Sequence, residues 1–201
     1  MKTITSRDNP LVKRLHALAH SARDRRQLGE TVLDGAHLVE AAIQAHWPLK
    51  AIVCAESGLT HPEHQRLLDA IGADVSRYLL PDVLFKHVSP VDTPSGVLAI
   101  IDLPPSAAPE PLTDSVVVLD AVQDPGNLGT ILRTLAWFGN YRCLLSPDSV
   151  EPFNGKAVRA SKAGDRPWPS APNSQATGPR RSSAWSEHAP SPSAVARQRP
   201  G

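Results

Sequence analysis

Apolar and polar positions alternate with two different periods along the first hundred residues, and this pattern predicts helices and strands in turn. The stretch between Asn9, the expected N-cap, and Gly29, the expected end, has apolar side chains at helical spacing and predicts one helix. Its apolar positions are Leu11, Leu15, Leu18 and Ala22, with Pro10 at the first helical position. Strands are predicted at "ETVLDG", "LKAIVCAE", "SRYLL" and "GVLAIIDL", and helices at "AHLVEAAIQAH", "PEHQRLLDAIG" and "DVLFKHV". This order predicts a small α/β domain over residues 1–103.

A proline-rich segment then separates this unit from a second one. Residues 104–114 include "PPSAAPEP", with four prolines in eight residues, and are expected to form a linker. Beyond it, "DSVVVLD" is a continuous apolar and β-branched run, which predicts a parallel strand buried on both faces. Helices are predicted at "NLGTILRTLAWF" and "FNGKAVRASKAG", with a strand at "RCLLS" between them. A partial second α/β domain is therefore predicted over residues 115–164.

Residues 165–201 have a different composition. They contain one valine, no leucine, isoleucine, phenylalanine, methionine or lysine, and abundant proline, serine, alanine and arginine. Such a segment buries too little apolar surface to offset its conformational entropy, so we expect it to be disordered. One explanation is a native disordered tail. The other is a truncation or a shifted reading frame near residue 164, which is favoured because the tail begins in the middle of a βα repeat.

The two cysteines indicate a reducing environment. Cys54 and Cys143 both lie in apolar, strand-like runs, where buried free thiols are expected rather than a disulfide or a metal pair. Cytoplasmic localisation fits this usage. No apolar run approaches the roughly 18 residues needed to cross a bilayer. The segment "HPEH" at residues 61–64 fits a helix start better than a metal site, because Pro62 starts a helix and no further ligands lie nearby. We therefore expect neither a membrane nor a metal partner.

Charge is distributed unevenly, although the formal net charge is only +1. Residues 1–28 carry seven Lys and Arg against two Asp, and residues 29–164 carry nine against sixteen acids. The basic residues of the first predicted helix are Lys13, Arg14, Arg23, Arg25 and Arg26. A basic amino-terminal arm on an acidic body predicts a polyanion partner that these residues contact. A solvated helix face is the alternative, and charge alone does not separate the two.

The stretch "LDAVQDPGNLGTILRTLAWFG" carries the candidate chemistry of the second domain. Ligands of open parallel sheets bind beyond the carboxyl ends of the strands, which is where Asp120 stands. Pro125 and Gly126 suit the centre of a type II turn, and Asn127 is expected to cap the helix that follows. Gly129 is expected to let the first helical turn approach a ligand closely. The N–H groups at this helix start predict a site for an anion.

Arg133 is the charged exception in this otherwise apolar helix. The buried stripe of the helix is expected to consist of Leu128, Ile131, Leu132, Leu135 and Phe138. Arg133 then lies on another side, about a turn and a half into the helix, where it would meet a phosphate or carboxylate held by the loop. A structural role, in which Arg133 pairs with Asp120 or Asp124, is the alternative.

These segments resemble the SpoU (TrmH-like) branch of the SPOUT RNA ribose methyltransferases. "LDAVQDPGNLGTILRTLAWFG" is similar to the first conserved motif of that family, and "EPFNGKAVRASKAG" to the segment that follows it. "ITSRDNPLVKRLHAL", "RDRRQLGETVLDGAHLVEAA" and "TPSGVLAI" resemble the family's amino-terminal RNA-binding domain. The resemblance covers residues 3–164. It implies a small α/β RNA-binding domain joined to a trefoil-knotted α/β methyltransferase domain, which dimerises and binds S-adenosylmethionine.

The implied reaction transfers a methyl group to a ribose 2′-hydroxyl of rRNA or tRNA. In the family, the arginine matching Arg133 is proposed to activate that hydroxyl. A guanidinium stays protonated (pKa above about 12), so we expect Arg133 to orient the reacting groups and to stabilise charge. Asn127, by the same match, is expected to shape the loop and contact the ribose or Arg133. Lys156, Arg159 and Ser161 fall in the second matching segment and are expected to contact RNA phosphates, unless they form only a solvated helix face.

The resemblance ends where the family would build its donor site. Family members continue with a glycine- and glutamate-containing loop and then a Ser-Leu-Asn segment, whose helix threads the knot. Neither follows residue 164 here, so no cofactor-binding residue is assigned and the donor pocket is expected to be incomplete. The alternative function is a non-catalytic RNA-binding module that keeps residues 1–103 as a folded unit, and donor binding would separate the two.

Overall fold

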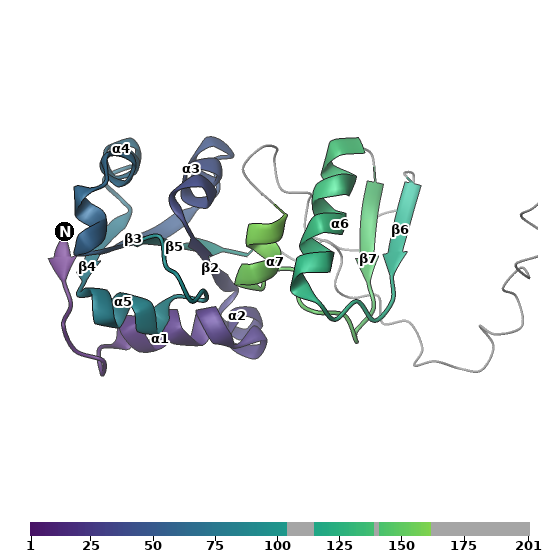
Figure 1. Cartoon of the computed structure of the whole chain (residues 1–201), viewed down its shortest axis with the longest axis horizontal. Coiled ribbons are helices and arrows are strands. Elements are labelled where there is room, and N and C mark those ends of the chain that lie inside the picture. The colour runs from purple at the N-terminus through teal and green to yellow at the C-terminus, as the bar shows by residue number, and fades with distance from the viewer. Residues whose placement is uncertain (104–114, 139–140, 162–201) are drawn as a thin grey trace, which may run out of the picture.

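The computed structural model describes residues 1–103, 115–138 and 141–161. The first range forms a five-stranded sheet with helices on both faces, and the other two form a smaller α/β unit beside it (Figure 1). The α/β class predicted from the sequence is confirmed. The expected linker over residues 104–114 and the tail over residues 165–201 lie outside the described residues, so their character stays a prediction.

Strands and helices fall where the apolar periodicity predicts them, with two additions, β1 and η1. The strands of the first unit are β1 (Lys2–Thr3), β2 (Glu30–Asp34), β3 (Leu49–Ala55), β4 (Ser76–Leu80) and β5 (Val97–Asp102). Its helices are α1 (Pro10–His20), α2 (Ala22–Leu28), α3 (Ala36–Gln44), the short 3-10 helix η1 (Ser57–Thr60), α4 (Pro62–Ala70) and α5 (Asp82–Val88). The second unit comprises β6 (Ser115–Leu119), α6 (Pro125–Phe138), β7 (Tyr141–Leu145) and α7 (Gly155–Ala160).

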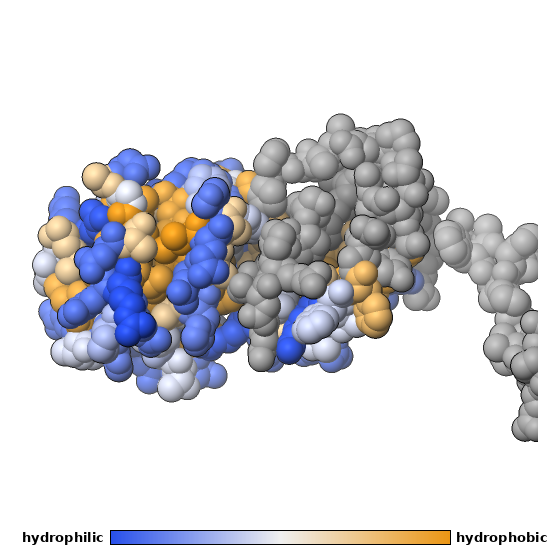
Figure 2. Space-filling view, turned by 90° about the horizontal axis from the view of Figure 1, so that it is seen from above, coloured by the Kyte–Doolittle hydropathy of each residue, from blue (hydrophilic) through white to orange (hydrophobic). Residues whose placement is uncertain are grey.

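The first sheet has the strand order β1-β4-β3-β5-β2 and separates two helical layers. Strands β1, β4 and β3 run parallel, while β5 is antiparallel to both β3 and β2. Side chains alternate between the faces, so Val53 and Leu98 pack with α1 and α5, whereas Ile52 and Ala99 pack with α3 and α4. Figure 1 shows these two helix pairs on opposite sides of the sheet. On the α3–α4 side, Figure 2 shows apolar surface between polar ridges.

The predicted single helix over residues 10–28 is two helices. Asn9 caps α1 as expected, because its Oδ1 accepts a hydrogen bond from the Leu11 N–H at 2.9 Å. Ser21 has an extended backbone (φ −122°, ψ 113°) and its hydroxyl accepts from the Asp24 N–H, so it ends α1 and caps α2. Gly29 ends α2 in the left-handed region, with φ 64°. Spacing alone missed the break, because the apolar period continues across Ser21.

The second unit is more exposed than its sequence predicted. Strands β6 and β7 pair in parallel, with Val117 opposite Cys143. Val118 is 66% exposed, so in the described part of the chain β6 is not buried on both faces. Phe138 is 76% exposed and lies outside the buried stripe of α6, whereas Leu128 is fully buried as expected.

Arg25 joins the two units. Its side chain is 3% exposed, its Nε donates to Glu151 Oε2 at 2.7 Å, and its Nη1 donates to the Leu18 carbonyl at 2.7 Å. This corrects the expectation that Arg25 contacts RNA, because the side chain is buried and its charge is balanced by Glu151. A second hydrogen bond, from the Thr31 hydroxyl to the Phe153 carbonyl at 3.1 Å, crosses the same junction.

The cysteines behave as predicted. Cys54 and Cys143 are buried free thiols, and burial raises the pKa of each to about 11. Within the described ranges, no helix combines the length and the hydropathy needed to span a membrane.

Glu30 is a buried carboxylate at the start of β2, with its side chain 4% exposed. It forms an ion pair with Arg14, whose Nε donates at 2.9 Å, and Lys50 Nζ donates to it at 2.7 Å. Burial acts to raise the pKa of Glu30, but the hydrogen bonds from Arg14 and Lys50 outweigh it and hold the pKa below its usual 4.5. The stabilisation is therefore fully present above pH 4.5 and is lost as the pH falls through the lowered pKa.

We expect Glu30→Gln to destabilise the protein at neutral pH by about 1–3 kcal/mol, because Arg14 and Lys50 lose their charged acceptor. The difference from the wild type should shrink in acid, since protonation removes the same charge from Glu30. Urea unfolding at about pH 7, 5 and 3.5 measures both effects. Glu40→Gln, on the exposed side of α3, is the matched control. A Glu30→Gln difference that stayed constant over this range would contradict the pairing.

Candidate functional site

The loop after β6 is the part of the second unit where the sequence predicted chemistry. It begins at Asp120 and is tied to the loop after β7 by hydrogen bonds from the Ala121 N–H to Ser146 Oγ at 2.9 Å, from the Val122 N–H to Ser149 Oγ at 3.2 Å and from the Val150 N–H to the Val122 carbonyl at 2.8 Å. Ala121 has φ 54°, a left-handed conformation that costs a residue with a Cβ about 1–2 kcal/mol. The two serines hold this strained loop in place, and nothing in the sequence pattern singled them out.

Helix α6 begins two residues earlier than expected. Pro125 and Gly126 form its first turn, which corrects the predicted type II turn. Asp124 caps the helix, because its Oδ1 accepts from the Asn127 N–H at 2.7 Å. The cap predicted at Asn127 is therefore wrong. The Asn127 side chain is exposed in the first turn, at the carboxyl end of β6.

Gly129 serves helix packing. A Cβ at this position would lie 2.5 Å from the Ala157 carbonyl oxygen and 2.6 Å from the Ala160 Cβ. Because real Cβ atoms do not approach a carbonyl oxygen this closely, only glycine allows α6 and α7 to pack at this separation. The close neighbour of Gly129 is thus α7, which corrects the expectation of a ligand there.

Arg133 is half-buried on α6. It follows Pro125 by eight residues, which places its Cα about 12 Å along the helix, more than the turn and a half expected. Helical side chains lean toward the N-terminus, so the guanidinium leans toward the Asn127 turn. Arg133 makes no hydrogen bond or ion pair to another described residue. The alternative role, pairing with Asp120 or Asp124, is therefore not observed within the described ranges.

Two of the three residues predicted to contact RNA phosphates, on or just after helix α7, are exposed to solvent. Asn154 caps the helix by accepting from the Lys156 N–H at 2.9 Å. The side chains of Lys156 and Arg159 are exposed. Ser161 is buried and donates to the Val158 carbonyl at 2.6 Å, which corrects its expected role as a phosphate contact.

The charge of Arg159 also affects a buried carboxyl group of the first unit. Asp34, at the end of β2, is buried, and burial raises the pKa of its carboxyl. The hydrogen bond from Ser89, the positive charge of Arg159 and the hydrogen bonds from Ser95 oppose that rise. Arg159 therefore lies close enough to Asp34 to stabilise its charged form across the junction.

Three of the amino-terminal basic residues are available to a polyanion. Arg23 and Arg26 are exposed on α2. Lys13 lies 3.0 Å from Asp8, and because both side chains are highly exposed, this ion pair contributes little and leaves Lys13 accessible. Arg14 forms the ion pair with Glu30 at the start of β2, and its side chain is 40% exposed, so its role as a phosphate contact stays a prediction.

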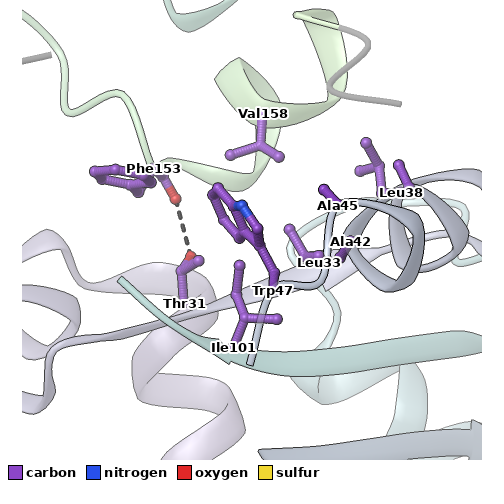
Figure 3. Close-up of a pocket in the computed structure, with 10 residues that line it drawn as sticks. Thr31, Leu33, Leu38, Ala42, Ala45, Trp47, Ile101, Phe153 and Val158 are labelled. Carbon is purple, nitrogen blue, oxygen red and sulfur yellow. Dashed lines mark hydrogen bonds between the residues drawn. The ribbon is translucent and has the colours of Figure 1, made fainter. Parts of the chain in front are cut away.

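A cavity lies at the junction of the two units (Figure 3). Its walls come from β2, α3 and the turn that follows it, β5, and α7 with the segment that leads into it, and Figure 3 shows Trp47 between Val158 and Ile101. The walls are apolar except for the indole N–H of Trp47 and the Thr31 hydroxyl, which is bonded to the Phe153 carbonyl. The cavity is therefore part of an apolar contact between the two units.

The segment "HPEH" has a structural role at the start of α4. Pro62 starts α4 as predicted. His64 is 1% exposed, and its Nδ1 lies 2.7 Å from the Gly58 carbonyl. Among the residues that the structure describes, no group of three His, Cys, Asp or Glu side chains is arranged to hold a metal ion.

The fold and the site together define a class of protein with two α/β units. The first unit carries basic helices, and the second presents Asn127 and Arg133 beyond a parallel strand. Residues 9–99 match the family model described as the MRM3-like substrate binding domain. Residues 114–172 match the SpoU rRNA Methylase family. The second unit therefore matches the SpoU rRNA methylase family and the first matches a substrate-binding domain, as the resemblance predicted.

Alignments with known proteins cover most of this chain. An uncharacterized tRNA/rRNA methyltransferase of Synechocystis is 36% identical over 171 residues, covering 79% of this chain and 58% of the relative. The 23S rRNA (guanosine(2553)-2'-O)-methyltransferase of Bacillus subtilis is 30% identical over 162 residues, covering 81% and 61%. The AdoMet-bound rRNA methyltransferase from Sinorhizobium meliloti superposes with a TM-score of 0.65 at 27% identity, covering 81% and 61%. The chain thus spans about 60% of the length of these relatives.

We expect Gly129→Ala to destabilise the second unit by about 1–3 kcal/mol, because the added methyl group would overlap the Ala157 carbonyl. Intrinsic helix propensity alone would make alanine stabilising at this position. A lower free energy of unfolding in the variant therefore indicates steric overlap with α7. Gly126→Ala is the matched control, since its Cβ would meet only the Asp124 side chain, at 3.0 Å. Urea unfolding of both variants gives the comparison. Unchanged or higher stability in Gly129→Ala would contradict the α6–α7 packing.

Proposed function

We propose that the protein acts as an RNA ribose 2′-O-methyltransferase, using S-adenosylmethionine on an RNA of the rRNA or tRNA class. The observation that carries the proposal is the half-buried Arg133, which has no partner among the described residues and lies on the helix that presents the exposed Asn127. Family membership and the printed activities of the relatives support it.

The chain's own residues would position the RNA. A 2′-hydroxyl is a poor nucleophile until it loses its proton, so a site must align it and stabilise the charge that develops. Arg133 stays protonated and presents a planar fork of donors, which suits a phosphate beside the reacting ribose. The Asn127 amide both donates and accepts, which suits the ribose hydroxyls. The Asp124 cap and the hydrogen bonds to Ser146 and Ser149 hold this loop in one conformation.

S-adenosylmethionine would supply the methyl group when bound. The cavity at the junction does not fit this donor, because adenosine and a carboxylate need several polar partners and its walls are apolar apart from the Thr31 hydroxyl and the Trp47 indole N–H. Its one hydroxyl, on Thr31, is already bonded to Phe153. No described residue is therefore assigned to S-adenosylmethionine binding. Donor binding remains part of the proposal, supported by the AdoMet-bound relative of the same fold.

The organisation of the chain is part of the same proposal. We infer a substrate-binding domain over residues 1–103, a linker over 104–114 and a partial methyltransferase domain over 115–164, supported by the meeting of the two family matches between residues 99 and 114. The second match continues to residue 172, past the break expected near 164. A homodimer is supported by the exposed apolar side chains of Val118 and Phe138, and a cytoplasmic location by the free thiols.

We expect RNA binding to weaken by orders of magnitude between about 50 and 200 mM salt, because Lys and Arg side chains on phosphates release counterions. The Arg23→Ala/Arg26→Ala double variant should bind less tightly, with the slope of log K against log salt reduced by about 1–2. Arg66→Ala, exposed on α4, is the matched control. Filter binding or fluorescence anisotropy with an rRNA fragment measures these slopes. An affinity insensitive to salt would contradict a phosphate interface.

We expect Arg133→Ala to abolish methyl transfer and to leave the melting temperature unchanged, because the side chain serves the RNA and not the fold. Arg133→Lys should restore little activity, since an ammonium lacks the planar fork. Incorporation of labelled methyl groups from S-adenosylmethionine into RNA, read beside a thermal melt, provides the test, with Arg66→Ala as the control. Retained activity in Arg133→Ala would return the residue to a structural role. RNA binding by the wild type without methyl incorporation would favour a non-catalytic RNA-binding module.

A further inference from the structure

Three histidines and an arginine gather on the outer side of α1 and α5. The ring of His16 stacks on that of His87, with centroids 4.6 Å apart and planes inclined by 27°. The His20 ring lies 4.6 Å from His16 at an angle of 51°. Arg7 Nη2 lies 3.0 Å from His87 Nδ1. Arg7 and His20 are exposed and the other two are half-buried, so the group is accessible from solvent.

The contact with Arg7 fixes the protonation state of His87. A guanidinium can only donate, so Nδ1 of His87 accepts, and the neutral ring carries its proton on Nε2. A proton added at Nδ1 would turn this hydrogen bond into a contact between two positive groups. Protonation of His87 therefore releases the Arg7 guanidinium for another acceptor.

Positive charge dominates the surroundings of the rings. Burial, followed by Arg7, His16 and His20, lowers the pKa of His87. Burial, His16 and Arg25 lower the pKa of His20, while a hydrogen bond to the backbone of His87 opposes them. The cluster is therefore poised to gain protons when an anion arrives.

Three of the four nearby acids are engaged elsewhere. Charged residues on the elements packed around the rings are Asp8, Lys13 and Arg14 on or before α1, Arg23, Asp24, Arg25 and Arg26 on α2, Glu30 on β2, and Asp82 and Lys86 on α5. Of the acids, Asp8 pairs with Lys13, Glu30 belongs to the buried network of β2, and Asp82 accepts hydrogen bonds from Ser57. The fourth acid, Asp24, lies among the three arginines of α2. These contacts leave an external anion as the suitable counter-charge for the rings.

We propose that Arg7, His16, His20 and His87 form an RNA phosphate contact that takes up protons when RNA binds. The proposal rests on the RNA-binding part of the function proposed above. A phosphate against the cluster offsets the repulsion between its positive groups and favours the protonated rings. By linkage, protonation must then tighten RNA binding to the same degree. RNA affinity therefore rises as the pH falls below the ordinary histidine pKa of 6.5.

The place of the cluster suits an RNA that also reaches the second unit. In Figure 1, α1, α2 and α5 lie along the lower side of the molecule, and the turn from β6 into α6 lies on the lower side as well. Helix α2 carries the exposed Arg23 and Arg26. An RNA along this side would contact the histidine cluster, then α2, then the Asn127 loop.

The test is the affinity of the whole chain for poly(U), whose bases do not titrate near neutral pH, from about pH 7.5 to 5.5 at constant ionic strength. Uptake of one proton changes the association constant by up to about tenfold per pH unit, so we expect Kd to fall by about tenfold over the range. The His16→Gln/His87→Gln double variant should lose most of the increase between pH 7.5 and 5.5. His37→Gln, exposed on α3 on the opposite face of the sheet, should keep the increase.

Histidine NMR titrations add an independent readout, because the pKa of His16 and His87 should rise when poly(U) is bound. Binding by the wild type that does not depend on pH would overturn the inference and leave RNA binding intact. An undiminished increase in the His16→Gln/His87→Gln variant would overturn it equally. Absence of salt-dependent RNA binding at both ends of the range would overturn the proposed function, and the inference with it. Circular dichroism at each pH confirms that the variants compared are folded.

Discussion

The buried ion pair between Arg25 and Glu151 is the constraint on which the rest of this structure depends. Both side chains are almost fully buried, at 3% and 9% exposed, so neither charge is tolerated without the other. Loss of one partner from such a pair costs about 3–5 kcal/mol. Arg25 also donates to the carbonyls of Leu18 and Ala19, which lie just before the break between α1 and α2. One side chain thus shapes the basic helices and attaches them to the second unit.

From this pair a continuous series of packed groups leads to the candidate active site. Glu151 stands just before Phe153, whose carbonyl binds Thr31, and before α7. Helix α7 packs directly on Gly129, where a single methyl group would not fit. Gly129 lies in α6 between Asn127 and Arg133. The orientation of the Asn127 loop relative to the basic helices is therefore determined by packed contacts within the described residues, and an RNA bound to one unit meets the other at a defined distance.

Periodicity was enough to predict most of the fold, because the apolar faces of the sheet and of its helices follow it closely. It missed β1, whose two residues show no period, and the break at Ser21, where the apolar spacing continues although the backbone does not. In the site, residue type drew attention to Asn127 and Arg133, whose roles stay predictions. It could not assign Arg25 or Gly129, because their roles depend on partners more than 25 residues away in the sequence: Arg25 appeared to be one of five similar basic residues until Glu151 was placed beside it.

We expect one RNA to contact the basic helices and the Asn127 loop together. Photo-crosslinking of an rRNA fragment containing 4-thiouridine, followed by identification of the crosslinked peptides, tests it directly and requires no methyl donor. Crosslinks are expected in peptides from residues 1–28 and from residues 119–133 with the same RNA. Crosslinks confined to α3 and α4, on the opposite face of the first sheet, would contradict it.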